Sequence, residues 1–277
     1  MEIKMKKGDE KMDNAFNTPV QVLDANMNAG EGKAKLPILK CILLGIMAGA
    51  FIGFGGASSN AAVHNIANQG LSKTLAGCIF PVGLMMIVFV GGELFTGDCL
   101  MIAGVVDKRF SAMAMIKTLV IVFFSNMVGA VLIATLVYFS GLLDYTNGAL
   151  GAFTIKVAYG KATITPFKAI CSGILCNILV CMAVLMATAA KDIVGKVWAI
   201  FFPICAFVIG GWEHCVANMF YIPAGIIACM NDTYVAKTEE LYGITADQIA
   251  SNLTVGGFVS NLIPVTIGNI LGGMVFI

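Results

Sequence analysis

Two short polar motifs interrupt long apolar stretches of this 277-residue chain, and their side chains can exchange protons or hydrogen-bond an anion. The second motif contains Glu213 and His214, and His214 is the only histidine within an apolar stretch. An imidazole changes charge near neutral pH, so it can donate a hydrogen bond to an anion or, when protonated, neutralise it. The first motif contains Glu93, Thr96 and Asp98. Because a charge within a membrane is costly unless it borders a cavity, we expect both motifs to face a polar interior.

The composition around these motifs is that of a multi-pass membrane protein. Apolar residues make up 58% of the chain and charged residues 12%, with a mean hydropathy of +0.89, whereas soluble domains carry about 25% charged residues. The formal net charge of +1 argues against a nucleic-acid-binding protein. The nine cysteines lie in apolar stretches without a C-x-x-C pair. We therefore expect reduced packing residues, with neither a metal site nor a cofactor.

Six stretches are long enough to cross a hydrocarbon layer of about 30 Å, which takes about 20 helical residues. Four of them are uninterrupted: residues 37–56, 112–140, 166–190 and 255–277. The other two, residues 75–106 and 197–230, are too long for one pass and contain the polar motifs. Non-helical backbone at this depth is tolerated only inside protein or beside water. The sequence thus predicts an all-α membrane protein in which spans two and five are each broken into two half-helices.

The N-terminal segment, residues 1–35, is polar and has no signal peptide pattern. Thr18 as N-cap, Pro19 in the first turn and Gly30 past the end predict a short helix on the membrane surface or against the bundle. With six spans, both termini lie on one side, and the loops of that side hold more Lys and Arg than the opposite loops. The positive-inside rule then puts both termini in the cytoplasm. We expect the chain in the cell (inner or plasma) membrane.

The region 36–277 contains an internal repeat, with copies at about residues 36–140 and 165–277. Three short patterns recur in corresponding spans and in the same order: Lys40-x4-Gly45 with Lys168-x4-Gly173, Gly91-Gly92-Glu93 with Gly210-Gly211-Trp212-Glu213, and Ser125-Asn126 with Ser260-Asn261. Because each copy has an odd number of spans, the second must enter the membrane inverted. Inverted repeats with broken helices at matching positions predict a permeation site near the membrane midplane.

These motifs resemble the signatures of the formate/nitrite transporter family. The similar segments are residues 90–97 (VGGELFTG), 173–183 (GILCNILVCMA), 212–219 (WEHCVANM) and 261–269 (NLIPVTIGN), with Met182 where the family usually has Leu or Val. The resemblance covers about residues 19–277 and is closest to the hydrosulfide channel branch. It implies an aquaporin-like protomer within a homopentamer, each protomer having its own pore for small inorganic or carboxylate anions such as formate, nitrite and hydrosulfide. It implies transport and no enzyme activity.

The resemblance also implies roles for residues of this chain. Apolar side chains would form two constrictions, the cytoplasmic one from Leu94, with Phe95 and Thr96 on the adjoining loop, and the periplasmic one from Phe80, Leu84 and Phe207. His214 would project into the chamber between them. Asn177 and Asn261 would be polar groups lining the pore, and Lys161 would lie in the outer vestibule.

A mechanism follows from these residue types. An anion drawn in by Lys161 and by half-helix dipoles pairs with His214 or takes a proton from it, and crosses the apolar constrictions with little net charge. Glu213 and Glu93 either take part in this path or accept backbone N–H groups of the following half-helices, and Asp98 and Asn218 are expected to be structural caps.

The main alternative to a channel is a proton-coupled secondary transporter of formate or a similar small carboxylate. A water or glycerol channel would share the inverted fold but needs two Asn-Pro-Ala turns, and the sequence contains none. A membrane enzyme would need a catalytic constellation beyond one histidine. A purely structural protein would have no reason to break two spans at matching places.

Overall fold

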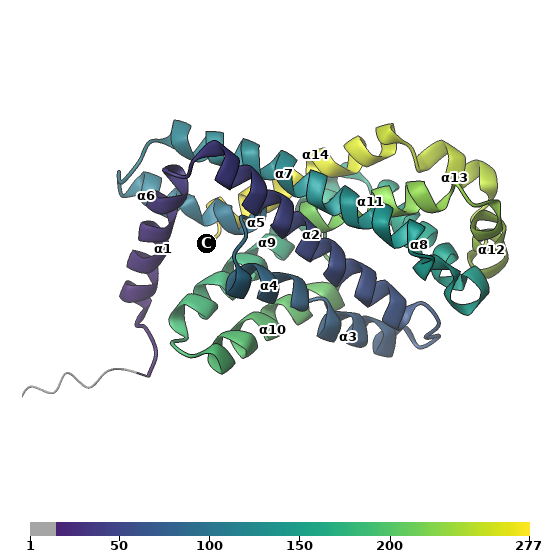
Figure 1. Ribbon diagram of the computed structural model, residues 1–277, viewed down its shortest axis with the longest axis horizontal. Helices are drawn as coiled ribbons and strands as arrows, with labels where there is room; N and C mark the ends of the chain where they lie inside the picture. The colour runs from purple at the N-terminus through teal and green to yellow at the C-terminus, as the bar shows by residue number, and fades with distance from the viewer. Residues whose placement is uncertain (1–14) are drawn as a thin grey trace, which may run out of the picture.

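The computed structural model describes residues 15–277, and the regular elements in that range are helices (Figure 1). Residues 1–14 of the predicted N-terminal segment lie outside the described residues. Within the described chain, six helical segments are long and apolar enough to cross a membrane: α2 (Ile38–Val63), α3 with α4 (Gln69–Ile79 and Val82–Val90), α7 (Ala112–Phe139), α9 (Pro166–Ala189), α10 (Ile193–Gly210) and α14 (Val255–Met274). The six predicted spans are therefore confirmed.

Both predicted breaks are present, and each is followed by a second half-helix. The first break lies between α4 and α5 (Phe95–Asp98), which continues through η1 (Cys99–Met101) into α6 (Ile102–Val106). The second lies between α10 and α11 (Cys215–Ala228). α4 ends at Gly91, which has a φ of 103°, and α10 ends at Gly211, which has a φ of 67°. Glycine adopts such positive φ angles without strain.

The two halves of the chain pack in the same manner. α2 lies along α7 in the first half, and α9 lies along α14 in the second. Glycines permit the close approach: a Cβ on Gly49 would stand 1.9 Å from a backbone oxygen of α7, and a Cβ on Gly268 would stand 2.3 Å from a backbone oxygen of α9. These are the small-residue contacts by which helices associate within a membrane.

The N-terminal helix α1 (Pro19–Ala34) begins where the sequence predicts but ends later. Thr18 forms a capping box with Gln21, which fixes the first turn. Gly30 was expected to follow the helix; instead it is helical and buried against Phe110, and α1 continues for another turn. α1 packs against α6 and α9 at one end of the molecule (Figure 1).

A second group of helices lies at the opposite end of the molecule, where the sequence analysis expected only loops (Figure 1). This group comprises η2 (Leu142–Asp144), α8 (Tyr145–Ala162), α12 (Asp232–Tyr242) and α13 (Ala246–Asn252). Their apolar side chains form a separate small core around Leu150 and Ile155. The Tyr234 hydroxyl donates a 2.5 Å hydrogen bond to Asp144 and so joins α12 to η2. None of these helices is a candidate span, because η2, α12 and α13 are too short and α8 is not apolar enough; α8 packs along α11.

Candidate functional site

The first break is held open by Asn126 of α7. Its amide nitrogen donates 2.8 Å hydrogen bonds to the carbonyl oxygens of Gly45 and Glu93, and its amide oxygen accepts the N–H of Phe95 at 3.0 Å. Asn126 is fully buried. One side chain thus pairs two backbone groups of the break, the Glu93 carbonyl and the Phe95 N–H, and ties them to the Gly45 carbonyl of α2. Unpaired backbone groups are costly in a membrane.

The second break is held by Asn269 of α14 in the same way. Its amide nitrogen donates to the carbonyl oxygens of Gly173 at 2.8 Å and Glu213 at 3.0 Å, and its oxygen accepts the N–H of Cys215 at 2.8 Å. Gly173 lies on α9 where Gly45 lies on α2, so the two bonding patterns correspond residue for residue. The internal repeat is therefore present in the hydrogen bonds as well as in the sequence.

This correspondence corrects one part of the predicted repeat. The sequence patterns matched Asn126 with Asn261, but the structure gives Asn126 its counterpart in Asn269, roughly two turns further along α14. The short Ser-Asn pattern misled because it occurs by chance in the wrong turn of an apolar helix. The matches of Gly45 with Gly173 and of Glu93 with Glu213 agree with the structure.

His214 begins α11 and meets Thr96 of the first break inside the protein. Its Nδ1 accepts the backbone N–H of Ala217 at 3.0 Å, so it serves as the N-cap of α11. The neutral ring must then carry its proton on Nε2, which lies 2.9 Å from the Thr96 hydroxyl oxygen. His214 is 2% exposed and Thr96 is fully buried. The structure thus brings Thr96, expected on the loop beside Leu94, into contact with His214, expected in the chamber.

Asn177 supports the backbone at Thr96. Its amide nitrogen donates to the carbonyl oxygens of Thr96 at 3.2 Å and Asn269 at 2.7 Å. The side chain is fully buried and borders neither of the two cavities described below. Both donors of the amide, expected to line the pore, are taken by backbone carbonyls.

One cavity, here called the α8-side cavity, has a volume of about 820 Å³. Phe80, Phe207, Glu213, His214 and Lys161 are among the residues that line it. The rings of Phe80 and Phe207 meet edge to face with centroids 5.6 Å apart, and the Phe207 ring lies 6.0 Å from the His214 ring. Two of the three side chains expected in the periplasmic constriction are thus in contact beside the histidine.

Lys161 and Glu213 form a partly buried ion pair in the wall of this cavity. Lys161 Nζ lies 2.9 Å from Glu213 Oε1 and 5.3 Å from the centre of the Tyr221 ring. The other carboxylate oxygen of Glu213 accepts a 2.6 Å hydrogen bond from Asn218. Glu213 therefore binds side chains and not the backbone N–H groups of α11, and Asn218 is a partner of Glu213 and not a helix cap.

Asn261, also expected to line the pore, is bonded to the protein through both ends of its amide. Its amide nitrogen donates to the Lys161 carbonyl oxygen at 2.8 Å, and its amide oxygen accepts from Asn218 at 2.8 Å. It is 1% exposed and borders neither cavity. Its place is behind the ion pair, where it fixes the backbone that carries Lys161.

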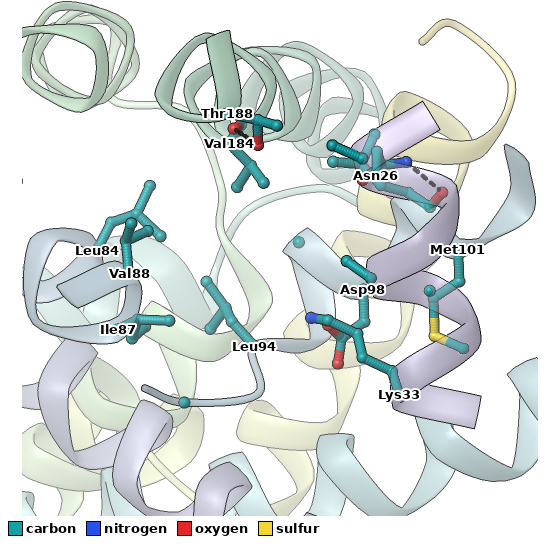
Figure 2. Close-up of a pocket in the computed structure, with 16 residues that line it drawn as sticks. Asn26, Lys33, Leu84, Ile87, Val88, Leu94, Asp98, Met101, Val184 and Thr188 are labelled. Atoms are coloured by element: carbon teal, nitrogen blue, oxygen red, sulfur yellow. Dashed lines mark hydrogen bonds and ion pairs between the residues drawn. The ribbon is translucent and has the colours of Figure 1, made fainter. Parts of the chain in front are cut away.

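The second cavity, here called the α1-side cavity, has a volume of about 200 Å³ and lies between α1 and the first break. Figure 2 shows Leu84, Ile87 and Val88 facing Leu94 across it, with Lys33 and Asp98 on the opposite wall. Leu84 was expected beside Phe80 but belongs here. It lies one helical turn beyond Phe80, about 6 Å along the helix axis. This distance places Phe80 at the α8-side cavity and Leu84 at the α1-side cavity.

Phe95, the first residue of α5, lies on neither cavity. Its ring packs edge to face on Phe123 of α7 with centroids 5.0 Å apart, and the side chain is buried. Its backbone N–H is the group bound by Asn126. Phe95 therefore anchors the first break against α7.

Lys33 of α1 is a functional candidate that the sequence analysis missed. Its ammonium lies 2.7 Å from Glu93 and also contacts Asp98, both buried in the first break. Burial lowers the pKa of Lys33, but the charges of Asp98 and Glu93 outweigh this and raise it above the ordinary lysine value. The sequence did contain an indication of this pair. The first break has two acids and no basic residue beside them, so a cation must come from another part of the chain.

Taken together, six spans, two matching breaks and a buried histidine–threonine pair between two cavities define an inverted-repeat membrane transport protein. Residues 20–277 match the family model for the formate/nitrite transporter. The chain belongs to the formate/nitrite transporter family.

Relatives with named functions match almost the whole chain. A probable formate transporter of Methanothermobacter thermautotrophicus is 40% identical over 96% of each chain. The formate channel FocA of Escherichia coli K12 is 35% identical over 95% of this chain and 93% of its own. Among solved structures, a pentameric formate channel with formate bound is 32% identical, with a TM-score of 0.75 over 86% of this chain and 94% of that one. A second solved structure, an ion channel of the FNT (formate/nitrite transporter) family, is 27% identical, with a TM-score of 0.78 over 93% of this chain and 96% of that one.

Proposed function

We propose that this chain conducts small monovalent anions of the formate, nitrite and hydrosulfide class. The path runs from the α8-side cavity, past Phe80 and Phe207, to His214 and Thr96, and then past Leu84 and Leu94 to the α1-side cavity. The observation that carries the proposal is the buried His214–Thr96 hydrogen bond between two apolar constrictions. The names of the relatives, which are formate transporters and channels, favour formate as a substrate.

The chemistry of the pair suits a small anion. A bare anion loses its hydration at an apolar constriction, and this loss is costly unless donors replace the water. When His214 Nε2–H donates to Thr96 Oγ1, the hydroxyl proton of Thr96 is free to donate to an anion in the chamber. The donation by Ala217 to Nδ1 favours this neutral form, since a proton on Nδ1 would face another N–H donor.

The runner-up is proton-coupled transport through the same path. In that mechanism the anion takes a proton near His214 and crosses as a neutral acid, and the ring is reprotonated from the other side. A neutral acid avoids the cost of a bare charge at Phe80 and Phe207. The two mechanisms differ in whether a formate gradient moves protons uphill.

We further propose that the α1-side cavity faces the cytoplasm, that both termini lie there, and that the chain resides in the cell membrane as a homopentamer. The even number of spans and the excess of Lys and Arg in the loops on the α1 side support the orientation. The pentamer rests on the relative whose structure is a pentameric formate channel. Its partners would then be the anion, protons, the lipid bilayer and four further copies.

The deciding experiment is flux into proteoliposomes of formate, hydrosulfide and glycerol across pH 5 to 9, about the range in which histidine changes charge. We expect anion flux without glycerol flux, and the larger anion rate identifies the preferred substrate. Glycerol flux without anion flux would overturn the proposal. H214N distinguishes the mechanisms: unchanged pH dependence of flux in this variant excludes the proton-linked one.

A further inference from the structure

The α8-side cavity holds two lysines that no acidic side chain of the described residues neutralises. Three lysines line the cavity, Lys73 of α3 and Lys156 and Lys161 of α8. Glu213 is the only acidic residue among those lining it, and this carboxylate is taken by Lys161. Within residues 15–277, neither Lys73 nor Lys156 has an ion-pair partner. The cavity therefore carries a surplus of two positive charges.

Both ammonium groups have defined surroundings. Lys156 Nζ lies 5.3 Å from the centre of the Phe153 ring and 5.8 Å from that of Tyr242, and aromatic faces at this range hold a cation. Lys73 Nζ lies 3.5 Å from the point that a Cβ on Gly211 would occupy. Because residue 211 has no side chain, the space beside this ammonium stays open at the end of α10.

The two lysines also repel each other electrostatically. Burial lowers the pKa of Lys156, and the positive charge of Lys73 lowers it further. A single monovalent anion would neutralise only one of the two ammonium groups and leave the other unpaired. A dianion would neutralise both and remove their mutual repulsion.

We infer that Lys73 and Lys156 form a binding site for a small oxyanion of charge −2 in the α8-side cavity, distinct from the His214–Thr96 pair. Sulfate is the simplest such ligand, because it keeps both charges throughout the neutral pH range. A dianion pays a larger desolvation cost than a monoanion at Phe80 and Phe207, so it binds without crossing. Where the proposed anion flux holds, on which this consequence rests, the bound dianion lies in the entrance and inhibits flux from that side.

The primary test is binding of radiolabelled sulfate to the purified full-length chain, which requires no transport. We expect saturable binding that unlabelled sulfate displaces and that methanesulfonate, a singly charged analogue of similar shape, displaces at least tenfold less well. K73Q and K156Q should each weaken sulfate binding by roughly tenfold. K156R, which keeps the charge, should retain most of the affinity. K237Q, on α12 but away from the cavity lining, is the matched control and should bind as the wild type does.

Two results would overturn the inference. One is sulfate binding that survives both K73Q and K156Q unchanged, and the other is equal competition by methanesulfonate, which would show that the double charge is not recognised. Absence of any sulfate binding overturns it as well. A separate flux assay then compares sulfate inhibition of formate uptake in wild type and K156Q. If sulfate binds as expected but formate does not move, the proposed function fails while the dianion site stands.

Discussion

The two breaks share one backbone design but differ in the residue that begins the second half-helix. Leu94 precedes α5 and His214 precedes α11, and each break is held by an equivalent asparagine. His214 caps its helix through Nδ1, whereas Leu94 has no polar atom with which to do so. α11 runs for 14 residues, but α5 gives way to a 3₁₀ turn after four. Duplicated scaffolds can thus diverge at one position into an apolar constriction and a polar centre.

The charges at the two breaks differ as well. The first break has two buried acids, Glu93 and Asp98, and receives Lys33 from α1. The second has a single acid, Glu213, because Asn218 occupies the position that matches Asp98, and its lysine comes from α8. The first break is therefore tied by charge to the N-terminal helix, and the second to the helices at the opposite end of the molecule.

The largest expected effect tests what the breaks share. N126A and N269A each leave two buried backbone groups of the break unpaired, a carbonyl oxygen and an N–H, and each such group costs about 1–3 kcal/mol. We expect the free energy of unfolding to fall by about 2–6 kcal/mol in either variant, measured by denaturant titration in detergent. N252A, which removes an exposed amide on α13, is the control. A large loss in one variant and none in the other would show that the two asparagines are not equivalent.

The next effect tests the first break alone. K33Q leaves Glu93 and Asp98 without their cation, and breaking a buried ion pair costs about 3–5 kcal/mol. Lys33 is 28% exposed in its side chain, so we expect a smaller loss, about 2–3 kcal/mol.

The pH dependence of this loss has a definite sign. Because the pKa of Lys33 is raised in the folded chain, its stabilisation is fully present below the ordinary value of 10.5 and is lost as the pH rises beyond it. Unfolding midpoints of wild type and K33Q should therefore differ by a constant amount between about pH 8 and 9, where the partner acids are ionised, and converge in strong base. A difference that is absent between about pH 8 and 9 would contradict the assignment.

The sequence predicts the fold well because the membrane imposes simple rules. Apolar length alone locates the six spans, and charge within an apolar stretch locates both breaks. Which polar side chain performs which task is less predictable. Asn177 and Asn261 look like pore residues in the sequence, yet their donors are used on backbone carbonyls, and only the three-dimensional packing reveals this.

The predicted place of Leu84 along its span, and the omission of Lys33, have a similar origin. Leu84 and Phe80 lie four residues apart on the same half of a span, and sequence spacing cannot say that a constriction ends between them. Lys33 was missed because its partners lie about 60 residues away in the chain. On an amphipathic helix such as α1, a lysine is expected to face solvent. Long-range charge pairing is the part of the site that a local motif does not encode.

A third prediction addresses the contact that joins the two breaks. T96V keeps the shape of the side chain but leaves His214 Nε2–H unpaired. We expect formate flux to fall by at least tenfold and the free energy of unfolding to fall by about 1–2 kcal/mol. T118V is the matched control, because the Thr118 hydroxyl bonds to a carbonyl of its own helix. Equal losses of flux in the two variants would mean that the hydroxyl of Thr96 has no special part in permeation.

The smallest effect returns to the charge difference between the breaks. K161Q removes the cation of the second break, but Glu213 keeps its 2.6 Å hydrogen bond from Asn218 and has no second acid beside it. The loss of unfolding free energy should therefore be about 1 kcal/mol, less than in K33Q. Formate flux that enters from the α8 side should fall more than flux that enters from the α1 side, because Lys161 lines the α8-side cavity and not the α1-side cavity. If K161Q destabilises the chain as much as K33Q does, the extra acid at Asp98 is not what makes the first break depend on its lysine.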